Sequence, residues 1–247
     1  MYYKEYLRAR RALVVFIIVA AVLLVISLVG MALGGGVDRK PDLVQWLALL
    51  GAAALAASIM ATVLGSALAQ ENDGHLELAW TKPYSRTRYA ATAIAIDMAA
   101  IVLALLVGFA FILIHIVIGH PNEHLVAGPD AAINALRFAL FPLAWYALIV
   151  GLSAGTRGRA GVVQGLIWPI ALVLVVLRDA PLSAMWHGVF VALNAINPLI
   201  YASYQDHGDV AIVGASPLHV VTSTVVLAAL VIAGWAAATI QWRRVEA

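Results

Sequence analysis

Apolar residues occur along this chain in six long runs that are separated by short polar segments. The runs cover residues 12–33, 43–69, 90–119, 131–154, 161–177 and 218–240. A helix rises about 1.5 Å per residue, so about 20 residues cross the hydrocarbon core of a bilayer, which is about 30 Å thick. The pattern therefore predicts six transmembrane helices. Pro142 and Pro169 are expected to kink the fourth and the fifth.

The composition indicates an integral membrane protein. Of the 247 residues, 64% are hydrophobic and 11% are charged, whereas a soluble domain is about 45–50% apolar and about 25% charged. We expect one all-α transmembrane domain over residues 1–247. The chain has no cysteine, which excludes disulfides and thiolate metal sites, and we expect no metal ion on it. Nucleic acid is not an expected partner, because the basic residues are those of membrane-flanking loops.

The distribution of basic residues predicts the orientation of the spans. Four of the 15 Lys and Arg residues fall on one side of the predicted membrane, and the other 11 fall on the opposite side, together with both ends of the chain. Positive charge accumulates on the cytoplasmic side. The sequence therefore predicts a multi-pass protein of the cell (inner or plasma) membrane, with both termini cytoplasmic.

The segment before the last span is ambiguous. Residues 178–217 contain a moderately apolar stretch, 182–204, that has the length of a seventh span. A seventh span would place the basic C-terminus outside, against the charge bias. The preferred interpretation is a re-entrant or interfacial extracytoplasmic hairpin, broken around residues 194–198, where two asparagines precede a proline.

The loop between the second and third spans carries the most distinctive polar pattern. Residues 70–89 begin with acidic and end with basic side chains, and residues 75–81 fit a short amphipathic helix. This loop is either a solvated turn with basic membrane anchors or a docking element for a cytoplasmic partner. The chain contains neither a phosphate-binding G-x-x-x-x-G-K-[ST] loop nor a dinucleotide-binding G-x-G-x-x-G turn. If ATP is used, another chain supplies the ATPase.

A family resemblance rests on this loop. Its sequence runs Glu71-x-x-Gly74-x-Leu76-Glu77-x-x-x-Thr81-x-Pro83-x-Ser85-Arg86-x-x-Tyr89. It resembles the signature E-x-x-x-G-T-L-E-x-L-L-x-x-P-x-S-R of permease subunits of type-2 ABC exporters, which have a similar six-span layout. The chain departs from that signature at His75, where the family often has Thr.

The resemblance implies specific roles and partners. In the family this loop carries a coupling helix, here residues 72–81, that sits in a groove of a separate ATP-binding cassette ATPase. The residues that would contact this ATPase are Glu71, Asp73, Gly74, His75, Leu76, Glu77, Trp80, Pro83, Ser85 and Arg86. ATP and Mg²⁺ would bind to the partner and no cofactor to this chain, which would not be an enzyme. The other expected partners are membrane lipid and a second permease, which is either a copy of this chain or a related chain. Residues 1–11 would match the family's amphipathic N-terminal helix.

Asp97 is the one carboxylate that lies well inside a predicted span. An ionisable group within a bilayer is costly, so a function is the default hypothesis. It could relay protons or contact a substrate. Alternatively, it could bond to a Ser or Thr or to a basic loop residue such as Arg157 or Arg159. An ATP-independent carrier or an intramembrane enzyme that uses Asp97 is the alternative to the permease.

Overall fold

The computed structural model describes nine stretches of the chain. They are residues 2–33, 46–71, 86–119, 131–153, 160–177, 184–202, 204–206, 209–211 and 217–244. These stretches are helical except for one small hairpin. Its strands β1 (Tyr204–Asp206) and β2 (Asp209–Ala211) pair in antiparallel fashion, with Gln205 opposite Val210.

Five of the described helices are long and apolar enough to cross a membrane. They are α1 (Tyr2–Leu33), α2 (Trp46–Glu71), α3 (Arg86–Gly119), α4 (Ala131–Ser153) and α8 (Pro217–Arg244). The predicted fifth span corresponds to α5 (Ala160–Val176), whose 17 residues extend about 26 Å. Two short helices, α6 (Ala184–Ala195) and α7 (Pro198–Ala202), follow it. The protein is therefore an all-α, membrane-embedded chain. Pro142 and Pro169 lie inside continuous helices, and the kinks expected there stay a prediction.

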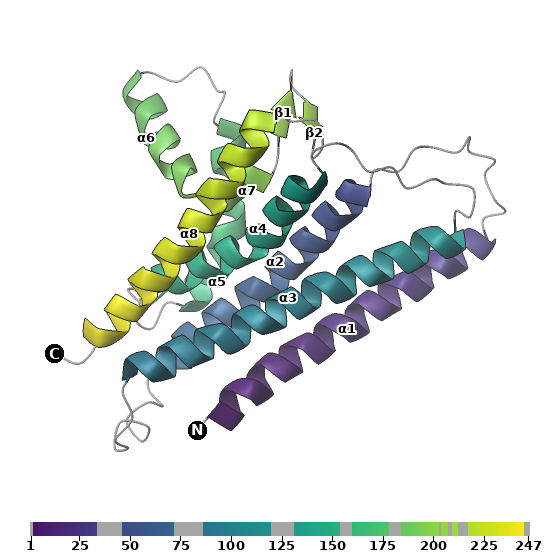
Figure 1. Cartoon of the computed structure of the whole chain (residues 1–247), viewed down its shortest axis with the longest axis horizontal. Helices are drawn as coiled ribbons and strands as arrows, with labels where there is room; N and C mark the ends of the chain where they lie inside the picture. The colour runs from purple at the N-terminus through teal and green to yellow at the C-terminus, as the bar shows by residue number, and fades with distance from the viewer. Residues whose placement is uncertain are drawn as a thin grey trace.

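The long helices follow one another across the bundle in the order α1, α3, α2, α4, α8, and each packs against the next (Figure 1). The two ends of the chain lie at the same end of the bundle, whereas α6, α7 and the β hairpin lie at the other (Figure 1). Because α1 contacts α3 far more extensively than α2, the first helix packs beside a helix that is not its neighbour in sequence.

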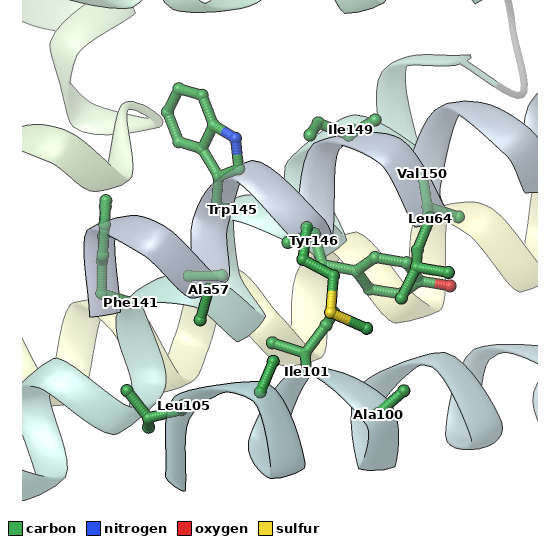
Figure 2. Close-up of a cluster of buried hydrophobic side chains, with 14 of the residues drawn as sticks. Ala57, Leu64, Ala100, Ile101, Leu105, Phe141, Trp145, Tyr146, Ile149 and Val150 are labelled. Atoms are coloured by element: carbon green, nitrogen blue, oxygen red, sulfur yellow. The ribbon is translucent and has the colours of Figure 1, made fainter. Parts of the chain in front are cut away.

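The core is centred on α4. Figure 2 shows Phe141, Trp145, Tyr146 and Ile149 of α4 among side chains of α2 and α3, and all four are fully buried. In a bilayer, helices approach most closely through small residues. On α2 these are four fully buried alanines, at positions 53, 54, 57 and 61.

Glycines mark the tightest contacts of α4. A Cβ added at Gly234 of α8 would lie 2.6 Å from the carbonyl oxygen of Ala147, and one at Gly65 of α2 would lie 2.8 Å from Ile149. Gly151 also faces Gly234 across the α4–α8 contact. No side chain larger than hydrogen fits at Gly234 without a backbone shift. These glycines therefore allow α2 and α8 to pack closely against α4.

The N-terminal segment is continuous with the first span, since α1 runs without interruption from Tyr2 to Leu33. The expected match of residues 1–11 to the family's amphipathic N-terminal helix stays a prediction. The reason for the continuity is local, because the sequence contains no Gly or Pro between Tyr2 and Val29 that would end a helix. The polar residues at the start of α1 are therefore carried on the same rigid element as the first span.

Candidate functional site

A buried carboxylate, Asp97 of α3, is held by side chains from two other helices. Asp97 is fully buried. Nη2 of Arg8, on α1, donates to both of its carboxylate oxygens, at 2.9 Å and 2.8 Å. The hydroxyl of Tyr146, on α4, donates to Oδ2 at 2.8 Å. The carboxylate thus joins α1, α3 and α4 at one point.

The same arginine contacts a second buried carboxylate. Nη1 of Arg8 lies 2.7 Å from Oε2 of Glu5, one turn earlier on α1, as an ion pair without the angle of a hydrogen bond. Glu5 is fully buried, and the hydroxyl of Tyr89 on α3 donates to its other oxygen. Glu5, Arg8, Tyr89, Asp97 and Tyr146 together form what we call the charge cluster.

The charge cluster places one guanidinium between two carboxylates. Removing an ion from water into a bilayer-embedded core is costly, and such groups persist only when they are paired and hydrogen-bonded. Here the planar fork of Arg8 serves both acids, and the two phenol groups each supply a further donor. Separating α1 from α3 would take Arg8 away from Asp97 and Glu5 away from the hydroxyl of Tyr89, so the charge cluster holds the start of α1 against α3.

The sequence identified one of the five members of this cluster. Asp97 was recognised from its depth in a span, but its expected basic partners, Arg157 and Arg159, lie outside the described residues. The observed partner, Arg8, is 89 positions away in the sequence. The sequence did contain a signal that pointed to Arg8. In an unbroken helix Lys4, Arg8 and Arg11 share one face, and apolar residues continue that face toward the membrane span. Roles of Asp97 in proton relay or substrate contact stay predictions.

Most of the predicted coupling residues lie outside the described residues. These are Asp73, Gly74, His75, Leu76, Glu77, Trp80, Pro83 and Ser85. The other two residues predicted to contact the ATPase are described: Glu71 is the last residue of α2 and Arg86 is the first of α3. Tyr89, the last residue of the loop motif, is a member of the charge cluster. The loop motif therefore ends in a residue that bonds to α1.

A second buried polar contact joins α2, α4 and α5, and no pattern in the sequence indicated it. Oγ1 of Thr62 on α2 accepts hydrogen bonds from the indole nitrogens of Trp145 at 2.9 Å and Trp168 at 3.0 Å. The hydroxyl itself donates to the carbonyl of Ser58 at 2.9 Å. The two indole rings are 4.3 Å apart at an angle of 40°. One hydroxyl thereby satisfies the indole N–H groups of buried Trp145 and half-buried Trp168, which an apolar residue would leave unpaired.

The interruption between α6 and α7 falls within the segment where the sequence predicts a break. Nδ2 of Asn194 donates to the carbonyl of Leu174 at 2.8 Å, and Nδ2 of Asn197 donates to that of Ala171 at 3.0 Å. Asn197 also caps α7, because its Oδ1 accepts from the backbone N–H of Leu199 at 3.2 Å. Two side-chain amides thus tie the break to α5. The re-entrant or interfacial geometry of this hairpin stays a prediction.

No protein family, curated protein or solved structure matches this chain.

Proposed function

We propose that this chain is the transmembrane permease subunit of an ATP-driven exporter of the type-2 ABC class. It forms a translocation path with a second permease copy and couples to a separate ATP-binding cassette ATPase, which binds ATP and Mg²⁺. Its six spans are α1 to α5 and α8. Both termini are cytoplasmic, and residues 178–217 form a re-entrant or interfacial hairpin on the opposite side of the cell membrane.

The observation that carries this proposal is the join between the loop motif and the charge cluster. Residues 71–89 have the family's order of acidic, glycine, proline and basic positions. The motif ends at Tyr89, whose hydroxyl donates to Glu5 of α1. Two helical turns further along α3, Asp97 accepts hydrogen bonds from Arg8, which lies on α1 as Glu5 does. A force applied to the loop is therefore passed to α1 as well as to α3.

This connection supplies a coupling mechanism. Closure of the ATPase on ATP displaces the coupling helix, residues 72–81, and with it the start of α3. Because the charge cluster makes separation of α1 from α3 costly, the two helices move together. The ATPase thus shifts the balance between inward-facing and outward-facing arrangements through its differential contacts with them. This chain breaks no covalent bond in that cycle.

The amide-tied break between α6 and α7 supports the hairpin. Irregular backbone at membrane depth persists only where protein satisfies its polar groups. At this break the backbone N–H of Leu199 donates to Oδ1 of Asn197, and the side-chain amides of Asn194 and Asn197 donate to carbonyls of α5. The contacts of Asp97 bear on its own role, because its carboxylate already accepts hydrogen bonds from Arg8 and Tyr146. This arrangement favours a structural part for the carboxylate over its use by an ATP-independent carrier or an intramembrane enzyme.

Co-purification from native membranes tests the proposal. The tagged chain is extracted in mild detergent, and mass spectrometry measures any Walker-motif ATPase that is recovered with it. We expect an ATPase at a roughly equal amount. Its absence, in a detergent that preserves a known ABC complex, would contradict the permease assignment and return attention to Asp97.

Loop variants then test the coupling assignment. Glu71→Lys and Pro83→Ala are each expected to lower ATPase recovery several-fold while membrane insertion is unchanged. The matched control is Glu123→Lys, a charge reversal in the loop predicted to lie on the opposite side of the membrane. Equal recovery with all three variants would show that residues 71–89 do not contact the ATPase.

A further inference from the structure

A groove lined mainly by apolar side chains runs along α1 beside α2. One cavity of 620 Å³ lies between α1 and α2, and a second of 390 Å³ lies between α1, α2 and α3. Both are lined by Phe16, Val19 and Ile59, so they are adjoining parts of a single groove. Each volume is in the range of ligand pockets, about 300–1,000 Å³. We call this feature the α1–α2 groove.

One end of the α1–α2 groove is basic. Lys4, Arg8 and Arg11 all line the larger cavity, and their spacing of four and three residues places them on one face of α1. Lys4 and Arg11 are exposed, and Arg8 is half-buried beside them and belongs to the charge cluster. The same face of α1 continues with apolar residues, so the basic end of the α1–α2 groove adjoins its apolar part.

The length of the larger cavity matches one leaflet of a bilayer. Its lining on α1 extends from Lys4 to Val19, and this 15-residue separation corresponds to about 22 Å along a helix. Half of a hydrocarbon core is about 15 Å thick, which leaves several ångströms for the headgroup region. The basic end therefore lies at headgroup level when the apolar part lies among acyl chains.

The rim of the groove favours lipid over a second protein chain. Transmembrane helices associate through small residues, as α4 and α8 do at Gly151 and Gly234. The rim of this groove instead exposes β-branched side chains, at Val15 (59%), Ile59 (62%) and Val63 (45%). None of the 18-residue window that best qualifies α1 as a span is buried within the chain. Flexible acyl chains fit such an uneven apolar surface better than a rigid helix does.

We propose that the α1–α2 groove binds one anionic phospholipid from the leaflet at the N-terminal end of the bundle. Its phosphate is held between Lys4 and Arg11, and an acyl chain lies along Val15, Val19, Ile59 and Val63. Basic pockets between transmembrane helices bind anionic headgroups by charge-assisted hydrogen bonds. The bound lipid covers the open side of α1, which α3 supports from the other side. This inference does not depend on the exporter function.

Site-specific quenching by brominated lipids tests the proposal. The chain has no cysteine, so Ile59→Cys places one fluorescent label in the groove. Leu106→Cys is the control, because Leu106 is exposed on α3 and lines neither cavity. It lies two residues from Gly108, which is close to the ring of Phe16 on α1, so the control label stays near the level of the groove. Each labelled protein is reconstituted into phosphatidylcholine vesicles that contain brominated phosphatidylglycerol or brominated phosphatidylcholine. We expect several-fold preferential quenching by the anionic lipid at position 59 and a ratio near one at position 106.

Charge variants identify the headgroup contacts. With the label at position 59, Lys4→Gln combined with Arg11→Gln is expected to lower the anionic preference to near one. Arg10→Gln, which removes an exposed charge of the same helix outside the groove lining, is expected to retain it. Three results would overturn the proposal: no preference at position 59, an equal preference at position 106, or an equal loss with Arg10→Gln. A label that neither lipid quenches would show that a second protein chain covers the groove, which also overturns it.

Discussion

Replacing Arg8 is the most informative perturbation of the fold, because Arg8 is the cation between the two buried carboxylates of the charge cluster. Arg8→Gln leaves both Glu5 and Asp97 without that cation. Removing one partner of a buried ion pair costs about 3–5 kcal/mol. Asp97→Asn leaves Arg8 paired with Glu5, and the amide oxygen at position 97 can still accept a hydrogen bond, so no buried charge loses its partner. We therefore expect Arg8→Gln to be the more destabilising change.

Thermal unfolding in detergent micelles measures this difference. The fluorescence of the seven tryptophans reports the transition. For chains of 150–250 residues, 1 kcal/mol shifts Tm by 2–4 °C, so Arg8→Gln should lower Tm by about 6–20 °C. Arg10→Gln is the matched control, since Arg10 is exposed on the same helix, and it should change Tm by less than about 2 °C.

A combined variant tests whether unpaired charge is the cause. Glu5→Gln with Arg8→Met and Asp97→Asn removes the cation and both acids together, and it should be more stable than Arg8→Gln alone. Two outcomes would refute the reasoning. One is equal Tm for Arg8→Gln and Arg10→Gln, and the other is a larger loss for Asp97→Asn than for Arg8→Gln.

Three further predictions concern the packing of the bundle. Gly234→Ala should cost about 1–3 kcal/mol through overpacking against α4, whereas Gly165→Ala, where an added Cβ meets nothing within 4 Å, should be neutral in the same unfolding assay. Thr62→Val should cost about 1–3 kcal/mol because two indole N–H groups lose their acceptor. Ser66→Ala should cost less, since its hydroxyl donates only to carbonyls of its own helix. Asn197→Leu should make proteolysis near the break between α6 and α7 faster, and an unchanged cleavage rate would contradict the proposed tie to α5.

The hydrophobic pattern predicted the helices well because their length is a local property of the sequence. Five of the six predicted spans correspond to helices long enough to cross a membrane. The break within residues 194–198 was also predictable, because Asn197 is a favourable helix cap and Pro198 suits the first position of the helix that follows. Both signals are contained in a few neighbouring residues.

The charge cluster could not be assembled from the sequence, because its contacts are not local. Asp97 was identified by its cost in a bilayer, but that cost does not specify which of the 15 basic residues satisfies it. Because residues 1–11 were expected to precede the first span, the basic partners expected for Asp97 were Arg157 and Arg159. The contact of Thr62 with two indoles was missed for the same reason, since it depends on how α2, α4 and α5 pack.

The pairing of α1 with α3 has a consequence for the order in which the protein is assembled. Arg8 and its partner Asp97 are separated by 89 residues, and ribosomes add about 5–20 residues per second. Arg8 and Glu5 therefore leave the ribosome about 4–18 s before the carboxylate that completes their cluster, and Tyr146 follows 49 residues later still. During that interval α1 lies in the membrane without α3, the helix that it contacts most extensively. When α3 enters the membrane, Arg8 is already present to neutralise Asp97. On this order of events, α1 acts as a template for the insertion of α3.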